Sequence, residues 1–103
     1  MKTFILSLSL SLFSAFAYSQ PLLLDVRSQG EWDEGHAYGA VHIPHSEISE
    51  KAPALLKDKN QEIKVYCKSG GRAGKAKMAL EALGYTNVEN VRTLENAKAY
   101  EPQ

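Results

Sequence analysis

Val65-Tyr66-Cys67-Lys68-Ser69-Gly70-Gly71-Arg72-Ala73-Gly74-Lys75 is the stretch that decides how this chain folds. An apolar run of β type ends at Cys67, a loop with two glycines follows, and a helical pattern begins at Arg72. Backbone N–H groups of a loop that enters a helix point into one concavity, and the helix dipole adds positive potential there. The sequence therefore predicts a strand, an anion-binding loop and a helix in direct succession.

Cys67 is the only cysteine of the 103 residues, and it lies at the mouth of the predicted concavity. Its thiolate would itself be the bound anion, because helix N-termini and nearby cations lower the pKa of a thiol from about 8.5 to roughly 3.5–7.5. We therefore interpret Cys67 as a nucleophile that is substantially ionised at neutral pH. The alternative is a buried structural cysteine, but the glycine pair and the flanking cations have no purpose in packing.

Positive charge gathers around the cysteine, although the whole chain carries 12 basic and 12 acidic residues. The charged residues between Ile63 and Leu80 are all basic, namely Lys64, Lys68, Arg72, Lys75 and Lys77. Lys68 and Arg72 fall within the loop, where a cation either binds a small anionic substrate or holds the loop in shape. Lys75 and Lys77 fit a solvated helix face. This basic cluster is too small for a stripe that tracks nucleic acid, so no nucleic-acid partner is expected.

Residues 1–17 have the pattern of a secretory signal peptide. A positive start is followed by an apolar stretch over 4–13 and by a small-x-small cleavage pattern at 15–17, and the run is too short to span a bilayer. We expect residues 18–103 to form one exported, periplasmic domain without a membrane anchor, beginning at Tyr18 or, with cleavage after Ser19, at Gln20. The domain is expected to be a monomer. An odd cysteine in an exported chain implies intermolecular pairing or a free reactive thiol.

Strand and helix patterns alternate along the predicted domain. Apolar runs predict strands over 22–26, 40–43, 63–67 and 88–91. A capping box at 28–31 opens a brief helix, Ser46 and Pro53 begin two short helices over 46–51 and 53–57, and the clearest helix covers 72–83 with Gly84 as its C-cap. The tail 96–103 is expected to be loosely held.

This alternation predicts an α/β fold, with a small parallel sheet flanked by helices in a single domain. Ligand sites in such sheets lie beyond the carboxyl ends of the strands. Asp25-Val26-Arg27 and Cys67 both lie at such ends, so they can converge on one pocket.

Two groups of residues resemble the rhodanese family of sulfurtransferases, most of all its minimal, exported single-domain members. The likeness runs from about Leu22 to Val91. The first group comprises Leu24-Asp25-Val26-Arg27, Glu31-Trp32, Gly35-His36, Gly39-Ala40 and His42-Ile43-Pro44, and the second is Cys67-Lys68-Ser69-Gly70-Gly71-Arg72, which matches the family's Cys-x-x-Gly-x-Arg active loop. Larger members carry a further helix and strand before the Asp-Val-Arg segment. After the last strand the family usually has a Gly-Gly turn, where this chain has Val91-Arg92-Thr93-Leu94.

The resemblance implies a thiosulfate sulfurtransferase with a rhodanese-like fold that works through a persulfide on Cys67, without a metal or an organic cofactor. Its partners would be the small anion thiosulfate as donor and cyanide or a thiol as acceptor. The resemblance assigns donor and persulfide binding to Lys68, Ser69, Gly70, Gly71 and Arg72, and a supporting role to Asp25, Arg27 and His36. For Asp25 and Arg27 the alternative is pairing with each other or with Glu31. Trp32 is expected to cover the small core.

Two other functions stay open at this point. One is a non-catalytic rhodanese-like module that binds sulfur or an anion, and the other is a cysteine-loop phosphatase or arsenate reductase. Those enzymes place the arginine after five residues, whereas four separate Cys67 from Arg72, which gives a tighter ring suited to a sulfur atom. His36, His42 and His45 are spaced by six and three residues and fit no standard zinc pattern, so no metal is expected.

Overall fold

The computed structural model describes residues 20–103, so the predicted signal peptide lies outside the described residues. The strands are β1 (Leu22–Asp25), β2 (Val41–His42), β3 (Ile63–Cys67) and β4 (Val88–Thr93). The helices are α2 (Gln29–Glu34), α3 (Ile48–Leu55), α4 (Gly71–Ala82) and α5 (Leu94–Ala97), with the 3₁₀ turns η1 (His45–Glu47) and η2 (Lys98–Tyr100). No helix of this range is long and apolar enough to cross a membrane.

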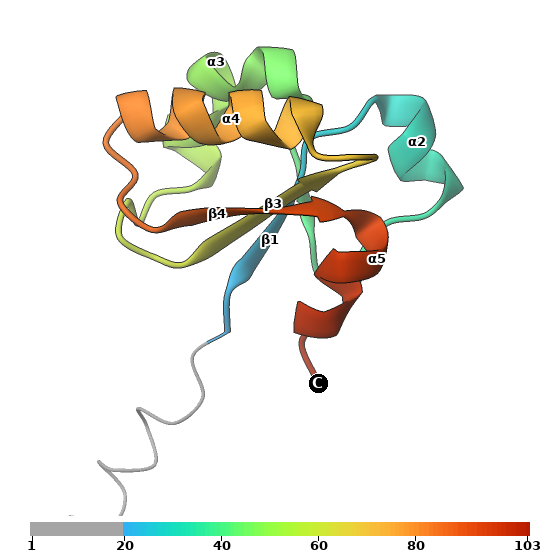
Figure 1. Ribbon diagram of the computed structural model, residues 1–103. Coiled ribbons are helices and arrows are strands. Elements are labelled where there is room, and N and C mark those ends of the chain that lie inside the picture. Colours follow the sequence, from blue (N-terminus) through green and yellow to red (C-terminus); the bar gives the residue numbers. More distant parts are fainter. Residues whose placement is uncertain (1–19) are drawn as a thin grey trace, which may run out of the picture.

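The strands form one parallel sheet in the order β2-β1-β3-β4. Helices α3 and α4 cover one face of this sheet, and α5 covers the other (Figure 1). Every residue of β3 is buried, as expected for a central strand of a parallel sheet with both faces covered. The predicted α/β fold is thereby confirmed.

The pleat of the sheet divides the buried side chains between two cores. Val65 and Cys67 belong to the core under α3 and α4, whereas Tyr66 belongs to the smaller core under α5. Neighbouring residues of a strand point to opposite faces, and residues in parallel register share a face. Asp25 is in register with Tyr66 and therefore lies on the face opposite Cys67.

One continuous helix replaces the two short helices predicted over 46–51 and 53–57. Helix α3 runs through Pro53 and has Glu47 as its N-cap, while Ser46 lies in η1. The reason is burial, because Ile48, Ala52 and Leu56 recur every four residues and are all buried. Packing of this face outweighs the one backbone hydrogen bond that Pro53 cannot donate.

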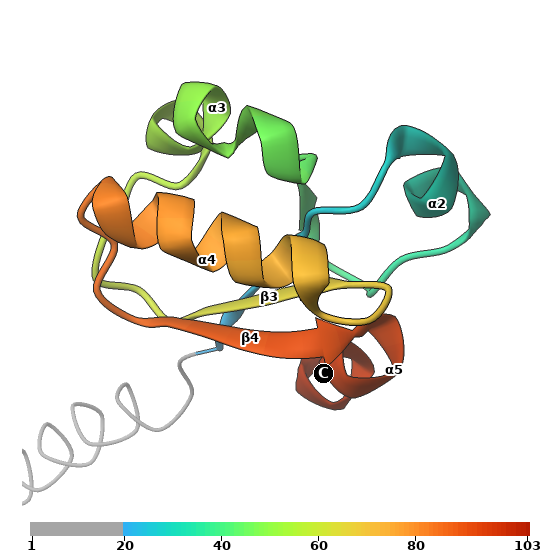
Figure 2. The same ribbon diagram turned by 45° about the horizontal axis from the view of Figure 1, so that its top comes forward.

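The prediction of a loosely held tail over 96–103 is wrong for residues 96–101. Asn96 N donates to Thr93 Oγ1 at 3.0 Å and caps α5, and Ala97 is fully buried in the smaller core. Further along, Tyr38 N donates to the Glu101 carboxylate at 2.7 Å. Figure 2 shows α5 beneath β4, where the tail completes the second face of the sheet.

Candidate active site

Cys67 ends β3, and its Sγ lies in the turn that opens α4. Gly70 N donates to Sγ at 3.0 Å and Ala73 N at 3.4 Å. Gly70 is the N-cap of α4 with a φ of +111°, a conformation that only glycine adopts readily. The predicted succession of strand, loop and helix is confirmed, and residues 68–72 are called the active loop below.

The environment of Cys67 favours the thiolate. Burial opposes ionisation, since only 1% of the residue is exposed. The hydrogen bonds from Ala73 N and Gly70 N, together with the nearby backbone N–H groups of Ser69 and Arg72, hold the pKa of the thiol below its ordinary value. The amides of the active loop and of the first turn of α4 are the largest favourable influence on the thiolate, and the charge of Arg72 also interacts with Cys67.

We expect the rate of Cys67 alkylation by iodoacetamide to rise with pH to a midpoint below that of the same thiol in the urea-unfolded protein. The lowered pKa means that the unfolded chain holds the thiol proton more tightly than the folded chain. The contribution of Cys67 to stability is therefore full above the unfolded pKa and is lost as the pH falls through the folded pKa. A midpoint equal to that of the urea-unfolded protein would show that the amides do not reach the sulfur.

The two cations of the active loop are placed differently. Arg72 Nη1 and Nη2 donate to the two carboxylate oxygens of Glu31 at 2.6 and 3.0 Å, which ties the active loop to α2. Hydrogen bonds from Arg72 and from the Ser28 backbone lower the pKa of Glu31 to about 2, so the ion pair persists at neutral pH. Lys68 is exposed to solvent.

Asp25 and Arg27 form a buried pair on the other face of the sheet. Arg27 Nη2 donates to Asp25 Oδ2 at 2.7 Å, and Tyr66 Oη donates to the same oxygen at 2.7 Å. This network extends to the next loop, because Arg27 Nη2 donates to Gly35 O at 2.6 Å and Ala37 N donates to Tyr66 Oη at 3.0 Å. Asp25 and Arg27 thus pair with each other, and their network reaches segment 35–37.

Trp32 does not cover the core as expected. Its ring is partly exposed and stacks with the rings of His36 and His42, whose centroids are 3.4 and 4.8 Å away. His36 Nδ1 donates to Trp32 O at 2.9 Å, and His42 Nε2 donates to Arg27 O at 2.8 Å. His36 therefore orders the end of α2. Residues 20–103 contain no cluster of three or more potential metal ligands.

Arg92 is absent from the site residues predicted by sequence, yet its side chain lies against the active loop. A Cβ built on Gly70 would lie 3.3 Å from Arg92 Cγ and 3.5 Å from Arg92 Cζ. Asn90 links the two segments, because its Nδ2 donates to Gly70 O at 3.0 Å and its Oδ1 accepts from Arg92 N at 2.9 Å. The signal in the sequence was the Val91-Arg92-Thr93-Leu94 segment that stands where the resembling family has glycines.

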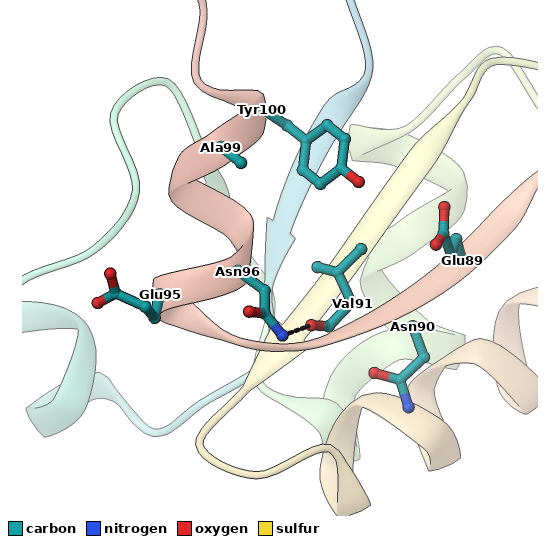
Figure 3. Close-up of a pocket in the computed structure, with 7 residues that line it drawn as sticks. All are labelled: Glu89, Asn90, Val91, Glu95, Asn96, Ala99 and Tyr100. Atoms are coloured by element: carbon teal, nitrogen blue, oxygen red, sulfur yellow. Dashed lines mark hydrogen bonds between the residues drawn. The ribbon is translucent and has the colours of Figure 1, made fainter.

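A hollow of about 450 Å³ lies between β4 and the two helical turns that follow it, and Cys67 does not line it (Figure 3). Its lining residues are Glu89, Asn90, Val91, Glu95, Asn96, Ala99 and Tyr100. Two carboxylates and no basic side chain line this hollow, so it does not suit an anionic ligand. The amides around Cys67 remain the better candidate.

Comparison with known proteins places the chain in a defined group. A family model described as a rhodanese-like domain matches residues 13–96, which include all four strands and the active loop. The thiosulfate sulfurtransferase PspE of Escherichia coli is 37% identical over 95 residues, which cover 92% of this chain and 90% of that protein. A solved structure described as a rhodanese with anions from E. coli has a TM-score of 0.71 at 36% identity and covers 80% of this chain and 94% of its own.

Some relatives share only the domain. The tRNA uridine(34) hydroxylase of Sodalis glossinidius is 33% identical over 76 residues, which cover 70% of this chain but 22% of that protein. The matching domain therefore occurs in proteins of different activity.

Proposed function

Since the chain belongs to the rhodanese-like domain family, we propose that it is a thiosulfate sulfurtransferase. The observation that carries the proposal is the placement of Cys67, whose sulfur accepts hydrogen bonds from backbone N–H groups at the start of α4. Similarity to PspE over nearly the whole of both chains supports the same activity, whereas the hydroxylase shares only a fifth or so of its length.

The proposed reaction has two steps. The Cys67 thiolate attacks the outer sulfur of thiosulfate, a new S–S bond forms, and sulfite leaves with the electron pair of the bond that breaks. Cyanide or a thiolate then attacks the terminal sulfur of the Cys67 persulfide, and the electron pair returns to Sγ. Atoms and charge balance in both steps, which together make a covalent, double-displacement mechanism without a metal or organic cofactor.

The active loop has a role in each step. Gly70 N and Ala73 N stabilise the resting thiolate and the negative charge on the persulfide, as donors aimed at developing charge do. Lys68, exposed beside the cysteine, attracts the anionic donor. Arg72 holds the loop against α2 through Glu31, and Asp25 and Arg27 act further away by fixing segment 35–37.

Intact-mass spectrometry tests the proposal directly. We expect excess thiosulfate to add one sulfur atom to Cys67, and subsequent cyanide to remove it and yield thiocyanate. Protein blocked at Cys67 with iodoacetamide is the control and is expected to gain no sulfur. An unchanged mass in unblocked, folded protein would favour the non-catalytic sulfur- or anion-binding module.

We also propose that residues 1–17 direct export to the periplasm and are removed there. The protein recovered from a periplasmic fraction is then expected to begin at Tyr18 or Gln20. Replacement of the small residue at the cleavage site, Ala17→Leu, is expected to slow processing and leave a longer chain. Recovery of a cytoplasmic product that starts at Met1 would contradict export.

A further inference from the structure

Arg92 has an unusual backbone conformation. It is the one non-glycine residue with a positive φ among residues 20–103, at +80°. It follows a bulge in β4, because Val65 pairs with Asn90 and Tyr66 pairs with Arg92, which leaves Val91 without a partner in β3. Side chains disfavour this region of φ, and residues held there are frequent at functional sites.

The bulge directs the Arg92 side chain across the active loop. Its Cβ and Cγ lie 3.4 and 3.3 Å from the position of a Cβ on Gly70, the residue whose N–H donates to Cys67 Sγ. The Asn90 side chain holds both partners, since it binds Gly70 O and Arg92 N through its two ends. The backbone of Arg92 is therefore fixed beside the loop, and Cζ of its guanidinium lies 3.5 Å from the same Cβ position on Gly70.

Arg92 differs from Arg72 in that no carboxylate of the described residues pairs with its charge. Arg72 is paired with Glu31, whereas none of the ion pairs within residues 20–103 involves Arg92, and Arg92 is exposed. The proposed first step brings a dianion to a thiolate, so like charges repel and a nearby uncompensated cation lowers that repulsion. Arg72 is held by Glu31, although its charge still interacts with Cys67, and Arg92 adds a cation without an ion pair beside Gly70.

We propose that Arg92 determines donor specificity, and that its guanidinium above Gly70 draws anionic reagents to Cys67 in preference to neutral ones. The identity of the anion as a sulfur donor rests on the proposed function. The preference for anionic reagents does not rest on the proposed function, because it applies to any reagent that reacts with the thiolate.

Two alkylating reagents of similar size separate charge from reactivity. We measure the second-order rate constants for alkylation of Cys67 by anionic iodoacetate and by neutral iodoacetamide at one pH. The ratio is the rate constant with iodoacetate divided by that with iodoacetamide. A change in thiol pKa affects both rates equally and cancels. We expect Arg92→Gln to lower the ratio by roughly 1.5- to fivefold, as for loss of one exposed charge interaction, and added salt to diminish the difference. Arg92→Lys should retain most of the preference.

Two further variants complete the test. Arg92→Gly removes the charge together with the unfavourable conformation, so the ratio is expected to fall while the thermal midpoint is unchanged or higher. Lys57→Gln removes one exposed charge between α3 and β3, at the other end of the strand from Cys67, and should leave the ratio unchanged. Equal rate losses for both reagents in Arg92→Gln would overturn the proposal.

Thiosulfate provides a separate readout. Persulfide formation in Arg92→Gln is expected to slow by a larger factor than the alkylation ratio falls, because thiosulfate carries two negative charges and iodoacetate one. If the wild-type protein formed no persulfide but the ratio still fell in Arg92→Gln, the proposed function would be refuted and the charge preference of Arg92 would stand. If persulfide formed normally in Arg92→Gln and the ratio did not change, Arg92 would have no part in donor selection.

Discussion

Cys67→Ser is expected to lower thiosulfate sulfurtransferase activity by about a thousandfold or more, because a serine hydroxyl is not ionised at neutral pH and forms no persulfide. The fold should survive the change. Gly70 N and Ala73 N, which donate to Sγ, can donate to a serine Oγ in the same place, so the buried hydroxyl keeps its partners.

Thiocyanate production from thiosulfate and cyanide measures this activity, and urea unfolding measures the stability of the variant. Cys67→Ala, which lacks any nucleophile, gives the background rate. Activity of folded Cys67→Ser close to that of the wild type would disprove the persulfide mechanism. If Cys67→Ser lost both its activity and its fold, its inactivity would not support the mechanism. The activity of folded Cys67→Ala would then be the test, and it is expected to be at background.

Asp25→Ala is expected to destabilise the protein by about 3–5 kcal/mol, the range for removal of one partner of a buried ion pair. Asp25 is fully buried and accepts hydrogen bonds from Arg27 and Tyr66. Without it, the Arg27 guanidinium and the Tyr66 hydroxyl lose their common acceptor. A loss of this size is a large part of the roughly 5–15 kcal/mol that stabilises a typical domain.

The midpoint of urea unfolding checks this value. Asp33→Ala is the matched control, because Asp33 lies on α2, is exposed, and binds only Gln29 among side chains of the described residues. We expect the control to change stability by less than about 0.5 kcal/mol. Combining Asp25→Ala with Arg27→Met should recover part of the loss, since no buried charge is then left unpaired. Equal effects of the two aspartate variants would contradict a buried network.

Local signals explain what the sequence could predict. The capping box at Ser28 and Glu31 and the apolar run into Cys67 act over a few residues, and each occurs where predicted. The predicted C-cap at Gly84 is off by one residue, because Leu83 is the C-cap of α4 and Gly84, with a φ of +99°, follows it. The active loop was equally accessible, because its glycines and its cysteine lie within one short segment. These features need no knowledge of distant partners.

Features that depend on residues far apart in the chain could not be predicted from the sequence in the same way. The face on which Asp25 lies follows from its register with Tyr66, and no local pattern states which residues of β1 and β3 pair. The ends of α3 and the order of the tail depend on burial of Ala52 and Ala97 against elements far along the chain. Arg92 reaches Gly70 through a bulge that the sequence shows only as missing glycines.

The bulge in β4 has a second consequence, for aggregation. A parallel sheet that is not closed leaves two edge strands, and a long, regular edge is a template on which another chain can add. Here one edge is β2, which has only two residues, and the other is β4, whose regular pairing is broken at Val91. Bulges and short edge strands are devices that proteins use against growth into fibrils. The same irregularity that turns Arg92 toward the active loop thus interrupts the regular edge that β4 would offer to another chain.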